Sequence, residues 1–393
     1  MLVTLAVENY RSLRRLVLPL RRLNVVTGAN GTGKSSLYRT LRLLAESARN
    51  GAVAALAREG GLPSTLWAGP ETVGRAVREG EHPLQGTVRT QSVALRLGFA
   101  TESFGYAVDL GLPQIRGDRS LFALDPEIKC ECTWSGPVLR PATRLTERKN
   151  AAVSVRGKDG GWRLTELKLR PYDSMLAEFV DPRLAPDLML LRERIRSWRF
   201  YDQVRTDAGA PMRAAQVGTR TPVLGHDGAD LAPALETIRE IGDAAALDAA
   251  VDLAFPGSQL GIEAHAGRFE LSLRQPGMLR PLTAAELSDG TLRYLTWVAA
   301  LLTPRPPELL VLNEPENNLH PDLLRPLGGL VAGASARMQI VVVTHSRALA
   351  SALDLQGGEA DLQSVELAKD DYGVSYVVGQ GKLDEPSWHW PKR

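Results

Sequence analysis

The sequence predicts an α/β protein in which a mostly parallel sheet is flanked by helices and interrupted by an inserted lobe of antiparallel strands and helices. Three observations support this fold class. The apolar run 23–27 ends at a glycine-rich loop, and a helical pattern starts at Ser35. Strand and helix patterns alternate again from about residue 269 onward. Between them, residues 87–166 hold short strand-like runs punctuated by Gly and Pro, as is typical of an antiparallel sheet.

Composition narrows the class of protein. The chain has 393 residues, of which 44% are hydrophobic and 23% charged, which excludes a disordered tail, a collagen-like repeat and a disulfide scaffold. The net charge of +2 by itself indicates neither a nucleic-acid nor a membrane partner. No apolar run approaches the roughly 18–20 residues of a spanning helix, so we expect no membrane partner.

The cysteines and the N-terminus indicate the compartment. Cys130 and Cys132 are the two cysteines, and a disulfide between positions so close in sequence would be strained. We therefore expect two reduced thiols. The N-terminus lacks the ordered regions of a secretory signal. Together these features predict a cytoplasmic protein.

Each element follows from the apolar spacing along the chain. Before the antiparallel region we expect strands at 2–7, 16–20 and 23–27, then a helix from Ser35. After it, helices are predicted at 172–179, 184–198, 231–241 and 244–255. The final part is expected to run as strand 269–273, helix 284–302, strand 309–312, helix 321–332, strand 339–343 and a helix from Arg347.

The glycine-rich loop carries the strongest chemical signal. Residues 28–35, GANGTGKS, match the pattern G-x-x-x-x-G-K-[ST] between a strand and a helix. Backbone N–H groups of such a loop surround phosphates, the lysine reaches the β- and γ-phosphates, and the serine hydroxyl binds Mg²⁺. The alternative is an ordinary glycine turn before a helix. The predicted nucleotide-binding residues are Gly28, Asn30, Gly31, Thr32, Gly33, Lys34, Ser35 and Ser36.

Three further polar segments follow apolar elements late in the chain. Residues 286–291, ELSDGT, open a predicted helix, where Ser-Asp-Gly could equally be an ordinary capping turn. Residues 309–316, LLVLNEPE, are an apolar strand that ends in polar side chains. A third strand ends in Thr344-His345-Ser346, and a lone histidine there is usually just a surface residue.

Taken together, these segments resemble the ATP-binding-cassette class of P-loop ATPases. GANGTGKS matches Walker A, LSDGT the signature, LLVLNEPE Walker B with the catalytic glutamate, and VVVTHS the switch-histidine strand. The opening VENYRSL resembles the RecF and structural-maintenance-of-chromosomes (SMC) branch, and the chain is most similar to RecF-type ATPases with an AAA-type core. The resemblance covers roughly residues 1–50 and 280–350.

The resemblance implies roles for individual residues. Glu314 would orient the attacking water, and His345 would sense the γ-phosphate of ATP. Ser288 and Gly290 would contact the γ-phosphate held by a second protomer, so an ATP-dependent homodimer is expected. Residues 317–320 would form the loop across that dimer.

The metal site departs from the family pattern. The resemblance implies Ser35, the Walker B position and a Q-loop glutamine as ligands of Mg²⁺. Asn313 replaces the usual Walker B aspartate, and its neutral amide should weaken Mg²⁺ retention, so we expect ATP binding with slow hydrolysis. Gln203 is the candidate Q-loop residue, with Gln91 and Gln114 as alternatives.

The motifs also predict the domain organisation. We assign 1–85 and 256–393 to the cassette core and 86–255 to the inserted lobe. The segment between Lys34 and Ser288 shows no heptads and no C-x-x-C, which excludes long coiled-coil arms and a zinc hook. The chain after Ser346 is too short for an appended nuclease, so any effector chemistry would come from a separate protein.

Arginines are the only sequence sign of a nucleic-acid partner. They cluster at positions 11, 14, 15, 21 and 22 and at 192, 194, 196, 199 and 205, the second group beside Trp198, Phe200 and Tyr201. Such a mixture suits phosphate contact and base stacking, although a solvated helix face is the alternative. Three hypotheses remain: a DNA-repair or chromosome-maintenance ATPase, the ATPase of a defence or toxin-like module with a separate nuclease, and a nucleotide-gated dimer acting on proteins.

Overall fold

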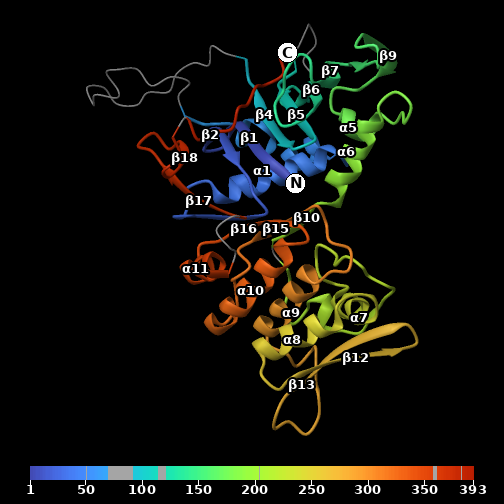
Figure 1. Ribbon diagram of the computed structural model, residues 1–393, viewed down its shortest axis with the longest axis vertical. Helices are drawn as coiled ribbons and strands as arrows, with labels where there is room; N and C mark the ends of the chain where they lie inside the picture. Colours follow the sequence, from blue (N-terminus) through green and yellow to red (C-terminus); the bar gives the residue numbers. More distant parts are fainter. Residues whose placement is uncertain (50, 70–91, 114–120, 203, 357–360, 382) are drawn as a thin grey trace. The chain divides into compact units, whose positions relative to one another are not determined.

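A computed structural model of the chain describes all residues except 50, 70–91, 114–120, 203, 357–360 and 382. The chain forms two compact units, each treated by itself below (Figure 1). Unit 1 consists of Met1–Leu20, Gly28–Ser197 and Glu366–Arg393, and unit 2 of Arg21–Thr27 and Trp198–Val365. The division into a cassette core and an inserted lobe stays a prediction, because compactness does not assign a function to either unit.

Unit 1 contains an eight-stranded sheet that is antiparallel throughout, in the order β2-β1-β4-β5-β6-β7-β8-β9. Its strands are β1 (Leu2–Tyr10), β2 (Leu13–Pro19), β4 (Leu95–Thr101), β5 (Phe104–Gly111), β6 (Glu127–Ser135), β7 (Arg144–Lys149), β8 (Ala152–Arg156) and β9 (Trp162–Lys168). The predicted antiparallel strands of 87–166 are thus present. They form one sheet with the N-terminal strands because β1 pairs with β4.

The first helix of unit 1 follows the predicted apolar spacing. Leu37, Leu41 and Leu44 recur on one face of the first helix and are buried. The predicted helix 172–179 is wrong in length, since only its second half is helical. The described helices are α1 (Lys34–Ser47), α2 (Ala52–Arg58), α3 (Gly61–Thr65), α5 (Met175–Glu178) and α6 (Pro186–Ser197).

A buried ion pair joins the middle of this sheet to the chain before α5. The side chains of Glu131 on β6 and Arg148 on β7 are fully buried, with 3.0 Å between Oε2 and Nη1. Tyr106 and Ser174 donate hydroxyl hydrogen bonds to Glu131, and Met175 donates its backbone N–H. Every carboxylate oxygen is therefore partnered, which is the condition for a charge to be tolerated in a core.

The cysteines are free and buried, as predicted. Burial raises the pKa of the Cys130 thiol to about 12, so it is protonated at neutral pH. The C-terminal segment packs on the same sheet. Trp388 contacts Trp134 edge-on at 5.5 Å between ring centroids, and Arg393 forms an ion pair with the buried Asp109.

Unit 2 is built on parallel strands. β10 (Arg199–Tyr201), β15 (Leu309–Asn313), β16 (Gln339–Val343) and β3 (Leu23–Gly28) pair in that order, each parallel to the next. The sheet continues with β17 (Leu362–Lys369) and β18 (Ser375–Val377), which pair antiparallel. The domain boundary after Val365 falls within β17. The prediction of a mostly parallel sheet holds for these four strands. It does not hold for the larger sheet of unit 1, which is antiparallel.

Helices and a second small sheet complete unit 2. The helices are α7 (Leu231–Ile241), α8 (Ala244–Ala254), α9 (Asp289–Leu301), α10 (Leu324–Ser335) and α11 (Arg347–Gln356), with 3₁₀ turns at Pro211–Arg213 and Pro321–Leu323. Strands β11 (Gln216–Val217), β12 (Gln259–His265), β13 (Arg268–Arg274) and β14 (Leu282–Thr283) form the small sheet, and Figure 1 shows the β12–β13 hairpin. One apolar core joins these helices to the parallel strands.

Two helix starts differ from the predictions. The helix expected over 284–302 begins only at Asp289, because Glu286 is held in a turn by Thr283 and Arg280 and Ser288 caps the helix. The helix expected over 321–332 opens as a 3₁₀ turn before α10. Among the described residues, no helix combines the length and apolar character of a membrane span.

The buried ion pair in unit 1 gives a stability prediction. Glu131→Gln leaves the Arg148 guanidinium buried without its counter-charge and should lower the free energy of unfolding by about 3–5 kcal/mol. Urea denaturation followed by circular dichroism measures this. The control Asp159→Asn breaks an exposed ion pair with Arg163 and should leave the midpoint unchanged. Equal midpoints for both variants would contradict the role of the buried pair.

Candidate functional site

The glycine-rich loop has the backbone shape that its sequence predicts. Gly28, Gly31 and Gly33 all have positive φ angles, of 140°, 80° and 107°. A Cβ atom on Gly28 would lie 2.3 Å from the carbonyl oxygen of Leu367, and one on Gly33 would lie 2.7 Å from Oγ of Ser375. Gly28 and Gly33 are therefore required both by conformation and by space.

Polar contacts hold the loop in shape within unit 1. Nζ of the buried Lys34 donates to the carbonyls of Gly28 and Ala29, at 2.6 and 3.0 Å. Ser375 donates to the carbonyl of Thr32 at 2.6 Å. The Lys34 ammonium thus lies against the loop it is predicted to serve, while Asn30, Gly31 and Ser35 are exposed.

The Walker B strand β15 ends in an unusual backbone conformation. Glu314, directly after Asn313, has a φ of 49°, in the left-handed region that residues other than Gly and Asn rarely adopt. Its N–H donates to the carbonyl of Val343 on the next strand, and its Oε2 accepts from Asn317 at 2.9 Å. Strain held in this way is typical of functional positions.

Glu316 fixes the end of the switch strand. Its Oε1 accepts three hydrogen bonds, from the Thr344 hydroxyl and from the N–H groups of His345 and Ser346, at 2.5, 3.0 and 3.2 Å. The His345 ring nitrogen Nδ1 lies 3.2 Å from the same oxygen and 3.7 Å from Oε1 of Glu314. The structure therefore places His345 beside Glu314, with Glu316 holding the backbone of the histidine; the catalytic roles of Glu314 and His345 stay a prediction.

The signature turn caps α9 and packs on the loop after β15. Ser288 accepts a hydrogen bond from the Thr291 N–H at 3.1 Å and is exposed. A Cβ on Gly290 would lie 2.9 Å from the carbonyl oxygen of Asn318, so the close approach requires glycine. The turn is a helix cap, as its alternative interpretation predicts, and it also contacts the 317–320 segment; its role as a signature stays a prediction.

Sequence reasoning gave no role to Arg213, which holds this turn. Its guanidinium donates to the carbonyls of Ala284 and Leu287 at 3.1 and 2.7 Å and forms an ion pair of 2.5 Å with Asp289. The side chain is only 11% exposed. In an arginine-rich chain, no local signal distinguishes this arginine from the others.

Asn313 lies beside a carboxylate that sequence reasoning also missed. Its Nδ2 donates to Oδ1 of Asp202 at 2.8 Å, and its own Oδ1 is buried without a hydrogen-bond partner. An unpartnered amide oxygen fits Mg²⁺ or a water bound to it. The candidate Q-loop residue Gln203 lies outside the described residues, as do Gln91 and Gln114.

The described residues contain no group of three His, Cys, Asp or Glu side chains spaced to hold a metal alone. Mg²⁺ usually keeps several waters and binds through one or two protein oxygens together with substrate phosphates. Asn313 therefore fits a metal that arrives with a nucleotide rather than one that the protein holds by itself.

The base-stacking interpretation of the second arginine cluster is wrong. Trp198, Phe200 and Tyr201 are 1, 5 and 1% exposed, because they pack into the interior. Many of the arginines bind within their own unit: Arg11 pairs with Glu59, Arg15 with Glu385 and Arg205 with Asp207. The aromatic residues of this segment therefore belong to the interior and offer no stacking surface.

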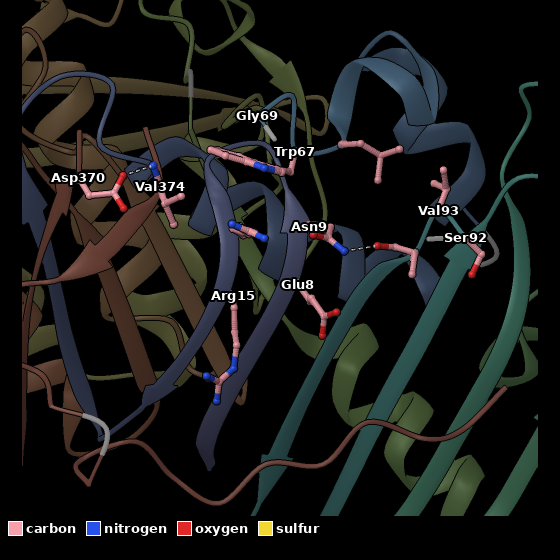
Figure 2. Close-up of a pocket in the computed structure, with 12 residues that line it drawn as sticks. Glu8, Asn9, Arg15, Trp67, Gly69, Ser92, Val93, Asp370 and Val374 are labelled. Atoms are coloured by element: carbon pink, nitrogen blue, oxygen red, sulfur yellow. Dashed lines mark hydrogen bonds between the residues drawn. The ribbon is translucent and has the colours of Figure 1, made fainter. Parts of the chain in front are cut away.

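Unit 1 also contains a cavity of about 560 Å³ between the first strands and the chain around Trp67 (Figure 2). Glu8, Asn9, Arg15 and Asp370 are among its lining residues. None of the phosphate-loop residues 28–36 lines it. This cavity is therefore not the predicted nucleotide site.

The loop, the parallel strands and the polar residues at their ends define a P-loop ATPase with the ATP-binding-cassette motifs. The sequence profile of the family described as "AAA domain, putative AbiEii toxin, Type IV TA system" matches residues 23–351. The chain belongs to this family of ATPases. No curated protein matches the chain in sequence.

Solved structures provide a second comparison, of the fold. The chain is similar to a structure described as the SmcHead bound to the C-winged helix domain of ScpA, with 12% identity, a TM-score of 0.50 and coverage of 96% of this chain and 97% of that one. It also matches the SMC head domain from Thermotoga maritima, with 16% identity, a TM-score of 0.44 and coverage of 96% and 98%. The first likeness shows that the chain shares the fold of that head domain.

The position of Lys34 gives a binding prediction. Lys34→Ala removes the one charged contact from a loop otherwise built of backbone donors, a loss of about 1.5–3 kcal/mol, so MgATP affinity should fall roughly 10- to 100-fold. Isothermal calorimetry measures the affinity. The control Lys168→Ala changes an exposed lysine on β9 and should bind as the wild type does. Unchanged affinity in folded Lys34→Ala would refute the loop assignment.

Proposed function

We propose that the protein is an ATPase that binds MgATP, hydrolyses it slowly and closes around two nucleotides as a homodimer. The observation that carries the proposal is the arrangement at the ends of β15 and β16. Glu314, held in a left-handed conformation, has an oxygen 3.7 Å from His345 Nδ1, and Glu316 fixes the backbone of that histidine. A carboxylate beside an imidazole at a strand end is suited to orienting water next to a phosphate.

Some of the residues would bind the nucleotide, and others would activate the attacking water. The N–H groups of the phosphate loop and Nζ of Lys34 would bind the phosphates, while Glu314 would accept a hydrogen bond from the attacking water. His345 would donate to the γ-phosphate. Mg²⁺, when bound, would neutralise phosphate charge, and the residues proposed to hold it are Ser35, Asn313 and the candidate Q-loop residue Gln203.

Asn313 is the reason to expect slow hydrolysis. Its amide oxygen can bind Mg²⁺ or a metal-bound water but brings no negative charge to the strand end. Glu314 is present, so hydrolysis is expected to proceed. We therefore propose a slow enzyme rather than an inactive one.

The dimer is argued from the signature turn. Ser288 is exposed at the N-terminus of the 13-residue helix α9, whose first N–H groups favour an anion. In the cassette arrangement the γ-phosphate of a second protomer supplies that anion. Two such contacts related by a two-fold axis give an isologous dimer.

The target of the ATPase is argued from the RecF-like resemblance and from arginines. Arg21 and Arg22 are exposed and adjacent in unit 2, which suits contact with DNA phosphates. We propose DNA as the substrate that the dimer holds in repair or chromosome maintenance. A second candidate is the ATPase component of a toxin-like module with a separate effector protein, which the family description favours.

The dimer proposal predicts a response to nucleotide. ATP should convert the Glu314→Gln protein from monomer to dimer, because loss of the water-orienting carboxylate should lower turnover at least about 100-fold while leaving binding intact. ADP should not, since it lacks the bridging phosphate. Light scattering after size exclusion measures the mass. A monomer in ATP would contradict the model.

Mixing two inactive variants tests whether the sites are shared between chains. The Lys34→Ala variant has an altered phosphate loop but an intact signature turn, and the Ser288→Arg variant has an altered signature turn but an intact phosphate loop. A heterodimer can assemble one intact site from these halves, so the mixture should recover part of the ATPase activity. Failure to recover any activity, with both proteins folded, would favour a site within one chain.

The DNA proposal predicts salt dependence. The logarithm of the duplex affinity should fall linearly with the logarithm of salt concentration, by about 0.9 for each phosphate contacted. Replacing both Arg21 and Arg22 by alanine should reduce the slope by up to about 2. Fluorescence anisotropy measures it, with Arg205→Ala as the control, because Arg205 is already paired with Asp207. Absence of binding at low salt with ATP present would favour the effector-protein alternative.

A further inference from the structure

We infer that Asp202 supplies the negative charge for nucleotide-bound Mg²⁺ that Asn313 does not, so that the Walker B carboxylate has moved to the neighbouring strand. The inference rests on the proposed function, since it concerns the metal that accompanies ATP. It is carried by the pairing of β10 with β15 and by the contact between the two side chains.

The strand register places the two residues level with each other. β10 and β15 run parallel, and Arg199, Phe200 and Tyr201 pair in turn with Leu310, Val311 and Leu312. Asn313 is the next and last residue of β15, and Asp202 directly follows the last residue of β10. Neighbouring strands lie about 4.8 Å apart, so both side chains emerge at the same edge of the sheet.

The contact between the side chains fixes the orientation of the amide. A carboxylate only accepts hydrogen bonds, so the Nδ2 of Asn313 must face Asp202, as the 2.8 Å contact shows. Oδ1 of Asn313 is thereby turned away and is buried without a partner. The pair thus presents one neutral oxygen ligand and, directly beside it, one negative charge.

The surroundings keep that charge available. Among the described residues, Asp202 forms no ion pair within 4.0 Å. The buried Arg293 on α9, which is 7% exposed, donates to the carbonyl of Val204 at 2.8 Å and forms no ion pair with Asp202 within 4.0 Å.

The position of the Asp202 carboxylate accounts for both parts of the proposed activity, namely the binding of MgATP and its slow hydrolysis. The negative charge of Asp202, at the end of the neighbouring strand, still attracts the metal, because the Asp202 carboxylate and the Asn313 amide are only a few ångströms apart. It does not lie where Asn313 would order a metal-bound water. Binding is kept, and the chemical step is slowed.

The test measures metal binding rather than turnover. Mn²⁺ replaces Mg²⁺ as a paramagnetic probe, and its affinity for the protein–ADP complex is measured by electron paramagnetic resonance. Asp202→Asn keeps the hydrogen-bond acceptor but removes the charge, so the dissociation constant for Mn²⁺ should rise at least about tenfold. ADP binding in EDTA should not change. Asp207→Asn, which alters an exposed carboxylate on the same segment, is the matched control.

The exchanged variant, Asp202→Asn with Asn313→Asp, keeps one carboxylate and one amide and can re-form the hydrogen bond with its roles reversed. It should recover wild-type Mn²⁺ affinity and provides the test if Asp202→Asn alone does not fold. An unchanged Mn²⁺ affinity in Asp202→Asn, or no recovery of that affinity in the exchanged variant, overturns the inference. If the wild type still binds ADP in that case, the proposed function is not contradicted. Failure of the wild type to bind any nucleotide overturns both.

Discussion

The parallel pairing of β10, β15, β16 and β3 is the constraint on which the functional groups depend. In parallel strands the carboxyl ends meet at one edge, so residues distant in sequence become neighbours there. The N–H of Thr344 donates to the carbonyl of Val26 at 3.0 Å, and the N–H of Glu314 to that of Val343 at 2.7 Å. These backbone hydrogen bonds connect the ends of three strands independently of any side-chain contact.

Buried side chains then hold the motif backbones in place. Glu316 collects three donors from the switch segment, and Arg213 binds two carbonyls and a carboxylate of the signature turn. Both are charged groups with little exposure, so leaving either unpaired would be costly. The motifs are therefore maintained by charged residues that would contact no nucleotide.

The sequence motifs predicted local structure well. The strand, loop and helix around Lys34 and the cap at Ser288 follow from patterns within a few residues, and the fold confirms them. The proximity of Glu314 to His345 depends instead on the pairing of β15 with β16. The eight-stranded antiparallel sheet did not follow, because the pairing of β1 with β4 joins segments about 90 residues apart. Asp202 was missed for the same reason: only the register of β10 against β15 places it beside Asn313. The burial of Trp198 and Tyr201 depends likewise on which face of their segment meets the core.

The left-handed backbone of Glu314 also sets a limit on how the protein can be stabilised. A glutamate in that conformation costs the fold on the order of 1 kcal/mol or more, whereas glycine or asparagine adopts it with less strain. A collection of variants sorted only for thermal resistance would therefore enrich replacements at this position and lose the carboxylate that we propose orients water. Selection that also retained the proposed hydrolysis would preserve glutamate there, so stability and turnover would make opposite demands on one residue.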